Sequence, residues 1–284
     1  MTRRVALLGN PLRRRHSKVM HDAAFAAAGI DASYELLELE ADAVAGVVAD
    51  AHGPEWLGLQ VTAPYKQLVA SLVDRVDADA EAIGAVNSVA RGDDGALVGF
   101  NTDAPGFRAG VELAMGRPLT GVAVVVAGAG GAAHAVVHSC VAARVAGVAI
   151  ANRDVVAAQR LVERFGTPLV PVRAVALDDP AFADALRSAD LAVNATTVGM
   201  TSPGMLIDPA LLANGATVFD LVYVPPETPL LRSARARGLR AANGSEMLIA
   251  QAALAFERWT GVGGMEGVMR EAVAPLLADA AALA

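Results

Sequence analysis

Short apolar runs alternate with longer amphipathic segments along most of the chain. Gly, Pro or Asn bounds each short run, as is typical of buried strands, and the longer segments carry apolar residues at helical spacing. This alternation predicts βα units around a mostly parallel sheet. The expected strands are Val5–Leu8, Ser33–Leu37, Leu57–Val61, Val86–Ala90, Val122–Ala127, Val148–Ala151, Leu191–Asn194, Thr217–Asp220 and Leu239–Ala241, and the expected helices include Met20–Ala28, Ala41–Ala51, Tyr65–Val73, Ala104–Ala114, Gly131–Ala143 and Val155–Phe165.

One internal boundary interrupts this pattern. The segment GRPLTG, residues 116–121, precedes a new strand with the sequence VAVVVA. The chain has 284 residues, of which 54% are hydrophobic, and this is enough apolar material to fill two cores. We therefore expect an α/β protein with two domains.

The charge balance excludes several classes of protein. With 23 Lys and Arg against 30 Asp and Glu, the net charge is −7, which argues against a general affinity for nucleic acid. The run Arg13-Arg14-Arg15 is therefore a local feature.

No apolar stretch of about 20 residues lacks Gly, Pro or charge, so no membrane partner is expected. The single cysteine, Cys140, forms no internal disulfide and is expected in the core, and a cytoplasmic location follows.

A glycine-rich turn follows the strand VAVVVA. Residues Gly128, Ala129, Gly130, Gly131 and Ala132 match G-x-G-x-x-A, in which glycines let the backbone approach a pyrophosphate at a helix N-terminus. Alone, the pattern also fits an ordinary tight βα turn. The next predicted strand ends about 25 residues after the first glycine, where an adenosine ribose would lie. A dinucleotide-binding domain is therefore predicted.

The end of that next strand, Asn152-Arg153-Asp154, bears on the choice of cofactor. Arg153 would pair with a 2′-phosphate, whereas Asp154 would repel one and accept hydrogen bonds from a ribose diol. Asp154 equally fits the N-cap of the following helix. The residue types leave these interpretations open.

Polar residues interrupt apolar surroundings in three loops that we expect at strand ends: QVTAPYKQ at 60–67, IGAVNS at 83–88 and GFNTDAPG at 99–106. Strand ends of this kind carry ligand contacts in open α/β sheets. Together the loops supply a lysine, an aspartate, amides and threonine hydroxyls. This combination suits a small polyhydroxylated substrate better than a macromolecule.

These segments together resemble the shikimate dehydrogenase family, including its quinate/shikimate relatives, from Leu8 to Trp259. VTAPYK, IGAVNS, NTDAPG and AGAGGAA are similar to the family's N-V-T-x-P-x-K, I-G-A-V-N-T, N-T-D-x-x-G and cofactor loop. NRD, NATTVGM, DLVYVP and GSEMLIAQAALAFERW follow in the same order, as the family's later motifs do. The resemblance implies an NAD(P)-dependent oxidoreductase of the shikimate pathway. It would transfer a hydride between the cofactor and the alcohol or ketone of a cyclic hydroxy acid similar to shikimate or 3-dehydroshikimate.

The resemblance also assigns roles to residues. Lys66 and Asp103 match the catalytic pair that handles the proton of the reaction; which of the two holds it stays open, and a surface ion pair is the alternative. Positions that contact substrate in the family are matched by Thr62, Asn87, Tyr223 and Gln251, and positions near the nicotinamide by Thr196, Leu221, Gly244 and Met247. For Thr196 and Met247, a structural role as a helix cap or a core residue is as compatible with the sequence as contact with the cofactor.

Gln251 lies on a predicted C-terminal helix that must return to the first domain. The implied fold is therefore an N-terminal α/β substrate domain, residues 1–104, completed by C-terminal helices of residues 244–284. A Rossmann-type NAD(P)-binding domain occupies residues 105–243.

The chain departs from the family's substrate loop, G-x-P-x-x-x-S-x-S-P-x-x-H-N. Arg15 stands where the first serine belongs and Ser17 is retained, whereas Lys18, Asp22 and Gln60 replace a proline, an asparagine and the asparagine of N-V-T. A guanidinium grips a carboxylate bidentately, so we hypothesise that Arg15 binds a substrate carboxylate and that the preferred acid need not be shikimate. The alternative is a solvated arginine loop in which Ser17 alone binds substrate.

The motifs also fit two neighbouring kinds of protein. One is an NAD-dependent quinate/shikimate-type dehydrogenase, and the second is a non-catalytic sensor of cofactor or metabolite, against which the retained Lys66 and Asp103 count. Asp154, and Ala157 where many NADP-using relatives have a second arginine, favour NAD slightly over NADP. His16 and His21 lack a third ligand at suitable spacing, so no metal is expected. A monomer and a homodimer are equally compatible with the sequence.

Overall fold

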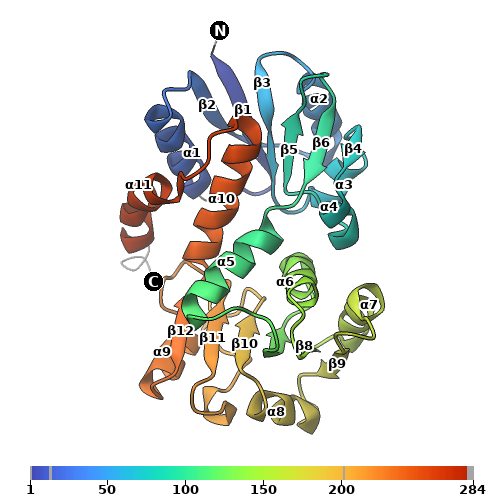
Figure 1. Cartoon of the computed structure of the whole chain (residues 1–284), viewed down its shortest axis with the longest axis vertical. Helices are drawn as coiled ribbons and strands as arrows, with labels where there is room; N and C mark the ends of the chain where they lie inside the picture. The colour runs from blue at the N-terminus through green and yellow to red at the C-terminus, as the bar shows by residue number, and fades with distance from the viewer. Residues whose placement is uncertain (1, 13–14, 201, 280–284) are drawn as a thin grey trace. The chain divides into compact units, whose positions relative to one another are not determined.

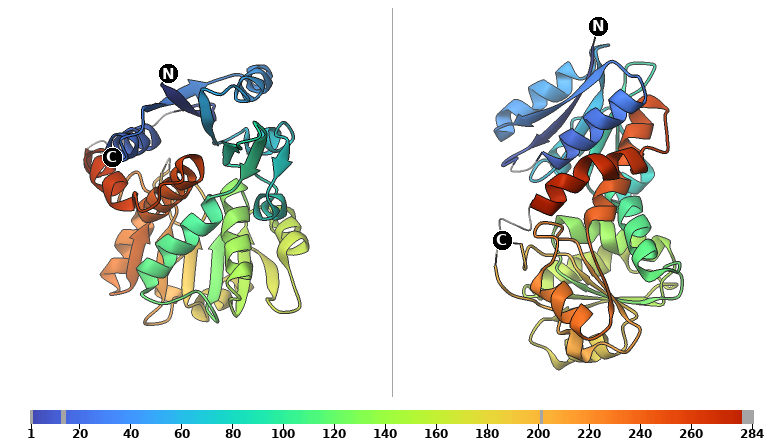
Figure 2. Two further views of the ribbon diagram at one scale, coloured as in Figure 1. Left: turned by 45° about the horizontal axis from the view of Figure 1, so that its top comes forward. Right: turned by 90° about the vertical axis from the view of Figure 1, so that its left-hand side faces the viewer.

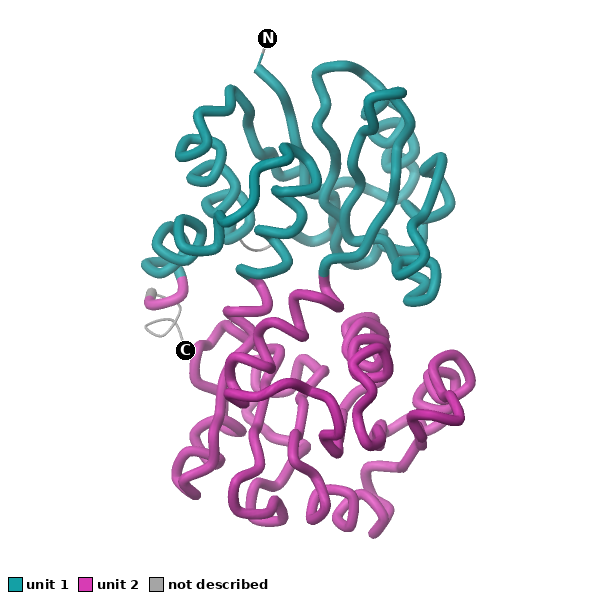
Figure 3. Tube along the Cα trace, viewed as in Figure 1, with its two compact units in different colours: residues 1–102, 249–276 teal, residues 103–248, 277–284 magenta. Residues whose placement is uncertain are grey.

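The computed structural model describes residues 2–12, 15–200 and 202–279, and the chain divides into two compact units (Figure 3). Unit 1 contains the residues up to Thr102 and Ile249–Leu276, and unit 2 contains Asp103–Leu248 and the described residues from 277 onward. The domain boundaries expected at 104/105 and 243/244 differ from these by two and five residues. The N-terminal segment and part of the C-terminal region thus share one unit.

Unit 1 is built on a six-stranded mixed sheet in the order β2-β1-β3-β5-β6-β4 (Figure 1). Strands β1 and β2 and strands β1 and β3 pair in parallel, whereas β5 runs antiparallel to β3 and β6. A tight turn at 92–96 joins β5 to β6, so these two strands form a hairpin rather than a βα unit. The strands are β1 Arg3–Gly9, β2 Ala32–Glu38, β3 Trp56–Val61, β4 Arg75–Val76, β5 Ser88–Arg91 and β6 Leu97–Phe100, and the helices are α1 His16–Ala27, α2 Ala41–Asp50, α3 Lys66–Ala70, α4 Ala78–Ile83, α10 Ser245–Thr260 and α11 Glu266–Asp279.

The two faces of this sheet bury different helices. Ala6 and Leu8 pack with Val44 and Val48 of α2, and alternate side chains of β1 therefore point to the opposite face. On that second face Phe25 of α1 and Phe256 of α10 meet with ring centroids 5.1 Å apart. Helix α10, distant in sequence, thereby completes the core of unit 1.

Unit 2 is a parallel sheet in the order β12-β11-β10-β7-β8-β9 with helices on both faces (Figure 2). This strand order is that of a Rossmann fold, with its reversal between β7 and β10. The strands are β7 Ala123–Ala127, β8 Gly147–Asn152, β9 Val172–Ala176, β10 Leu191–Asn194, β11 Thr217–Asp220 and β12 Arg240–Asn243, and the helices are α5 Asp103–Met115, α6 Gly131–Ala142, α7 Val155–Phe165, α8 Pro180–Arg187, the 3₁₀ helix η1 Pro209–Leu211 and α9 Pro229–Ala236.

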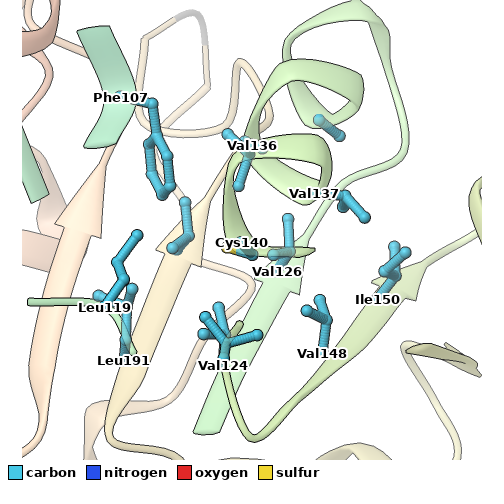
Figure 4. Packing of buried hydrophobic residues seen from close by; sticks show 14 of the residues in the cluster. Phe107, Leu119, Val124, Val126, Val136, Val137, Cys140, Val148, Ile150 and Leu191 are labelled. Carbon is cyan, nitrogen blue, oxygen red and sulfur yellow. The ribbon is translucent and has the colours of Figure 1, made fainter. Parts of the chain in front are cut away.

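The larger core of unit 2 lies between the sheet and helices α5, α6 and α7. Val124 and Val126 of β7 contribute to it together with Ile150 of β8, and Val136 and Cys140 of α6 cover them (Figure 4). Cys140 is completely buried, and this burial raises the pKa of its thiol to about 12. The expectation that Cys140 is a core residue is therefore confirmed.

The long elements agree with the predicted ones, and most differences concern short elements. The first helix begins at His16, four residues before the predicted start at Met20. Strands β4, β6 and β9 and helices α4, α8 and α9 are not among the predicted elements, and α11 is expected only as one of the C-terminal helices, without limits of its own. Apart from α11, these span two to eight residues, too few to establish a clear period in the sequence. Among the described helices, none is long and apolar enough to cross a membrane.

Candidate functional site

Lys66 is the first residue of helix α3, and the loop 62–65 connects it to the end of strand β3. The backbone N–H of Thr62 donates to the Leu8 carbonyl at 2.9 Å, and the N–H of Tyr65 donates to the Thr62 carbonyl at 3.0 Å. These bonds tie the loop to the end of the adjacent strand β1. Thr62 and Lys66 are therefore both placed, half-buried, at the carboxyl end of the parallel strands of unit 1.

A buried polar network lies in the same unit. Asn87 accepts a hydrogen bond from the Thr102 N–H at 2.8 Å, and its Nδ2 donates to the Thr102 hydroxyl at 3.0 Å. Gln251 Oε1 lies 3.4 Å from that hydroxyl and accepts from Gln60 Nε2 at 2.9 Å. Gln60 Oε1 in turn accepts from the Tyr34 hydroxyl. The structure thus brings Asn87 and Gln251, two predicted substrate contacts, into one connected network.

These polar side chains are almost completely buried, with exposed fractions of 2% for Asn87, 4% for Gln60 and 6% for Gln251. Burying polar groups costs free energy unless they are hydrogen-bonded, so the network fixes their orientation. A cluster of oriented amides and hydroxyls recognises hydroxyl and carboxylate groups of a small molecule.

Ser17 and Arg15 lie at the start of helix α1. Arg15 occupies the N-cap position, where its side chain is exposed and makes no capping hydrogen bond. Ser17 is half-buried, and its side chain opposes part of the rise that burial causes in the pKa of the Tyr34 hydroxyl. Ser17 is therefore close to Tyr34, which belongs to the buried network. Arg13 and Arg14, the other arginines of the run, lie outside the described residues.

Asp103 is the first residue of helix α5 and is half-buried. It belongs to unit 2, whereas Lys66 belongs to unit 1. Asn101, just before it, donates from Nδ2 to the Ala85 carbonyl at 2.8 Å, which ties the NTD loop to the IGAVNS loop. Two of the three polar loops predicted from the sequence are therefore physically joined.

The glycine-rich turn of unit 2 connects strand β7 to helix α6. Gly128 has φ +114°, and a Cβ there would lie 2.7 Å from Thr196 Cγ2 and 3.0 Å from the Ala195 carbonyl oxygen. Fold geometry thus requires glycine at 128. At Gly130 and Gly131, in contrast, a Cβ would meet no protein atom within 4 Å. The protein leaves space above these two glycines, as a bound pyrophosphate requires at the N-terminus of α6.

Residues Ala129 and Ala132 complete the turn, and both leave it open to ligand: Ala129 is half-buried and Ala132 is exposed. The first turn of helix α6 contains no acidic residue, and no side chain caps its N-terminus. The first turn of α6 therefore holds no carboxylate that would repel a phosphate and no side chain that occupies its N-terminal N–H groups.

Asp154 caps helix α7 at the end of strand β8. Its carboxylate accepts a hydrogen bond from the Val156 N–H at 3.0 Å, and Asn152 Nδ2 donates to the Asp154 carbonyl at 2.9 Å. The capping role weighed from the sequence is therefore observed. Arg153 and Asp154 are both exposed, so capping leaves the Asp154 carboxylate accessible to a ligand as well.

A second polar network joins the ends of strands β10 and β11. Asn194 accepts from the Thr196 hydroxyl at 2.7 Å and donates from Nδ2 to Asp220 at 2.8 Å. Asp220 also accepts from the Thr228 hydroxyl at 2.6 Å and the Val222 N–H at 3.0 Å. Burial raises the pKa of Asp220, and these hydrogen bonds oppose the shift. Asn194 and Asp220, the first residues of the NATTVGM and DLVYVP segments, thus connect the two segments.

The remaining predicted cofactor contacts line the same region of unit 2. Thr196 uses its hydroxyl within a turn, since it also accepts from the Val198 N–H at 3.1 Å. Leu221 and Met247 are partly buried and pack against the larger core of unit 2, and Gly244 is buried just before α10. Met247 thus has the core position considered from the sequence, whereas Thr196 caps no helix and stabilises a turn; contact of either residue with the cofactor stays a prediction. Tyr223 is half-buried in the loop after β11.

Sequence reasoning missed Tyr34, Thr102, Asn194 and Asp220 as members of the polar networks. Thr102, Asn194 and Asp220 each lie inside a recognised motif, so the motifs carried a signal for them. Tyr34 lies in an ordinary strand, and no local pattern marks it.

Among the residues that the structure describes, no group of three His, Cys, Asp or Glu side chains is placed to hold a metal ion.

Three family models match the chain. A shikimate dehydrogenase substrate-binding domain matches residues 7–89, a shikimate/quinate 5-dehydrogenase model matches residues 112–208, and a shikimate 5′-dehydrogenase C-terminal domain matches residues 244–274. The shikimate dehydrogenase (NADP+) of Geobacter sulfurreducens is 38% identical over 275 residues, which are 95% of each chain.

Solved structures of similar proteins agree with these matches. Shikimate 5-dehydrogenase from Thermus thermophilus, in complex with NADP(H) and shikimate, has a TM-score of 0.85 at 37% identity and covers 96% of this chain and 99% of its own. Quinate dehydrogenase from Corynebacterium glutamicum, in complex with NAD, has a TM-score of 0.88 at 32% identity and covers 96% and 99%. The chain therefore belongs to the shikimate dehydrogenase family and is an NAD(P)-dependent oxidoreductase.

Proposed function

We propose that the protein interconverts the secondary alcohol and the ketone of a cyclic hydroxy acid of the shikimate type. NAD(P) supplies the hydride acceptor or donor when bound. Asn87, Gln251, Thr62 and Ser17 bind the ring hydroxyls and the carboxylate in unit 1. Tyr223 supplies a further carboxylate contact.

The observation that carries this proposal is the buried network of Asn87, Thr102, Gln251 and Gln60. A core without ligand has no need of four buried polar side chains held in one orientation, because apolar residues would pack there at lower cost. Their amides and hydroxyls match the hydroxyl-rich acid that the Thermus relative binds. The network therefore supports a small polar substrate over a macromolecular partner.

Proton transfer is the task of Lys66 and Asp103. Removal of a hydride from a secondary alcohol also releases the hydroxyl proton, which a side chain must accept. In the reducing direction a protonated Lys66 donates to the carbonyl oxygen, and Asp103 is the second group of the proposed proton-handling pair. A pure sensor needs neither group for proton transfer, so both residues favour an enzyme.

The first experiment is a steady-state assay of purified protein at 340 nm, with shikimate and quinate each tested with NAD and NADP. Two variants of Lys66 separate charge from proton transfer. Lys66→Met removes the amine, and Lys66→Arg keeps the charge on a group that does not deprotonate in proteins. Both should lower kcat at least about 100-fold. Full activity of Lys66→Arg would show that position 66 acts only as a fixed charge, and wild-type protein that binds cofactor but oxidises neither acid would contradict the proposal.

For the cofactor we propose a modest preference for NAD. The support is Asp154, whose exposed carboxylate at the end of β8 would repel a 2′-phosphate, and Ala157, which offers no second cation. Asp154→Thr restores the N-R-T motif, and Thr also caps helices, so α7 should stay intact. The variant should raise the NADP/NAD ratio of kcat/KM about tenfold. A wild-type kcat/KM at least tenfold higher with NADP would refute the preference.

We also propose that Arg15 binds the substrate carboxylate beside Ser17. Its exposed position two residues before Ser17 at the start of α1 supports this role. Arg15→Ser should raise KM for the best acid or move the preference toward shikimate. If Arg15→Ser leaves both KM and the substrate profile unchanged, Arg15 is only part of a solvated loop.

A further inference from the structure

Three positions at which this chain departs from the family's motifs meet on one residue, Tyr34. Lys18 Nζ donates to the Tyr34 carbonyl at 2.7 Å, and Asp22 accepts from the Tyr34 N–H at 3.1 Å. Gln60, the third departure, accepts from the Tyr34 hydroxyl. Three unrelated substitutions would not be expected to contact the same residue, so these contacts indicate a shared structural role.

The backbone of Tyr34 is held by helix α1. Strand β2 is the edge strand of its sheet, so its outer N–H and C=O groups have no partner strand. Lys18 and Asp22, which also form an ion pair at 2.8 Å, satisfy one carbonyl and one N–H of this edge, both belonging to Tyr34. The pair therefore fixes Tyr34 from outside the sheet.

The ring of Tyr34 is held equally firmly. It is completely buried and stacks on His21 with centroids 4.6 Å apart and planes 10° apart. Burial raises the pKa of the Tyr34 hydroxyl, so it stays protonated and acts as a donor. The Tyr34 hydroxyl donates this proton to Gln60 Oε1.

From Tyr34 the direction of each hydrogen bond propagates to Gln251. Gln60 accepts at Oε1 from Tyr34, so its Nε2 donates, and Gln251 must present Oε1 to it. The hydrogen bonds at the opposite end of the network lead to the same orientation of Gln251. The backbone N–H of Thr102 donates to Asn87 Oδ1, so Asn87 Nδ2 donates to the Thr102 hydroxyl oxygen. The hydroxyl of Thr102 can therefore use its own proton to donate to another acceptor. Its acceptors within reach are Gln251 Oε1 at 3.4 Å and Asn87 Oδ1 at 3.3 Å.

We propose that Tyr34 is a positioning residue that fixes the amide of Gln251 through Gln60, and that Lys18 and Asp22 hold Tyr34 for this role. The inference rests on the proposed function, in which Gln251 contacts the acid substrate. With Oε1 turned toward Gln60, the Gln251 amide meets any further group through Nε2, as a donor. It therefore favours a substrate oxygen that accepts, such as a carboxylate or a ring hydroxyl oxygen.

Residue length explains why position 60 carries glutamine. Asparagine, the residue of the family motif, is shorter by one methylene, about 1.5 Å of chain. An amide drawn back by that distance would lose either Tyr34 or Gln251, because Gln60 now bridges the two. Tyr34 and Gln60 therefore form a matched pair.

The test is Tyr34→Phe, which keeps the stacked ring and removes only the hydroxyl. KM for the best acid should rise about three- to tenfold, kcat should change less than about twofold, and the affinity for NAD(P) should stay unchanged. In a Gln251→Ala background the same change should add less than about 1.5-fold, because the residue through which Tyr34 acts is gone. Gln60→Asn should reproduce the rise in KM.

Tyr65→Phe is the matched control, since it removes another buried tyrosine hydrogen bond, to the Leu39 carbonyl, outside the network. Its effect on KM, whatever its size, should combine multiplicatively with that of Gln251→Ala. If Tyr34→Phe also combines multiplicatively with Gln251→Ala, or lowers kcat with KM unchanged, Tyr34 is merely structural and the inference is wrong.

A second measurement separates this inference from the proposed function. The side-chain amide NMR signals of Gln60 and Gln251, assigned with Gln→Ala variants, report the network without any substrate. Both signals should shift in Tyr34→Phe and stay unchanged in Tyr65→Phe. Shifts together with no turnover of any acid by wild type would overturn the proposed function and keep the positioning role, whereas turnover without shifts would overturn the positioning role alone.

Discussion

His21 is completely buried against aromatic rings, and this burial should make the stability of unit 1 depend on pH. Its ring stacks on Tyr34 and lies 5.1 Å from the ring of Trp259. Burial lowers the pKa of His21 from an ordinary value near 6.5 to about 3, and the Gln60 side chain opposes only part of the shift. Folded unit 1 therefore keeps this imidazole neutral where the unfolded chain would protonate it.

The size of the effect follows from the two pKa values. The unfolded chain takes up a proton near pH 6.5, whereas the folded chain does so only near pH 3. The contribution of neutral His21 to stability is thus fully present above pH 6.5 and is lost as the pH falls toward 3. Each pH unit inside this window changes the free energy of unfolding by about 1.4 kcal/mol. Between pH 7 and pH 5 the expected loss is about 2 kcal/mol.

Urea unfolding followed by tryptophan fluorescence measures this loss, because both tryptophans of the chain, Trp56 and Trp259, belong to unit 1. The control is His21→Phe, which keeps an aromatic ring in the stack and takes up no proton. Wild type should lose about 2 kcal/mol more than the variant between pH 7 and pH 5. Carboxylates that titrate in this range are common to both proteins and cancel. An excess loss below about 0.5 kcal/mol would refute the burial argument.

Three further predictions concern single contacts. Gly58→Ala would bring a Cβ to 2.6 Å from Trp259 Nε1 and 2.0 Å from a strand carbonyl, so it should destabilise unit 1 by at least about 2 kcal/mol in urea unfolding; a change below about 0.5 kcal/mol would show that α10 yields easily. Gly128→Ala should lower the melting temperature, because residue 128 has a positive φ. Gly130→Ala should leave the melting temperature unchanged and weaken NAD(P) binding measured by calorimetry. If the two variants change the melting temperature and the binding by the same amounts, the proposed phosphate contact is contradicted. Asp220→Ala should destabilise unit 2 by about 3 kcal/mol by leaving buried donors without an acceptor, and a loss under about 1 kcal/mol, measured by calorimetric unfolding, would show that water replaces the carboxylate.

The fold class could be predicted because its signals are local. Strand β7, the glycine turn and helix α6 occupy consecutive residues, so their order and spacing are visible along the chain. The same holds for the long helices α2, α5, α6 and α7, whose predicted limits agree with the observed ones within about one residue. Short elements such as β4, with two residues, carry no comparable signal.

The candidate site was predictable only in part. Motifs mark Lys66, Asn87 and Gln251 as candidates, but they do not show the connection between Asn87 and Gln251. That connection runs through Thr102, and Gln60 and Tyr34 extend it. Gln60 and Gln251 are separated by 191 positions, so no pattern in a local window joins them. Asp154 shows a different limit, because one residue type fits both a helix cap and a ribose contact, and only the hydrogen bond to Val156 identifies the cap.

By itself the sequence determined the α/β class, the dinucleotide turn and the motifs that mark the family. Those properties depend on periodicity, on glycine and on the order of short segments, all of which are local. The tertiary structure alone decided that Lys18, Asp22 and Gln60 meet on Tyr34 and that the amide of Gln251 is held in one orientation. Such contacts join side chains from α1, β2, β3 and α10, which only packing against a common sheet brings together, and the direction of a hydrogen bond depends on the partner at its other end.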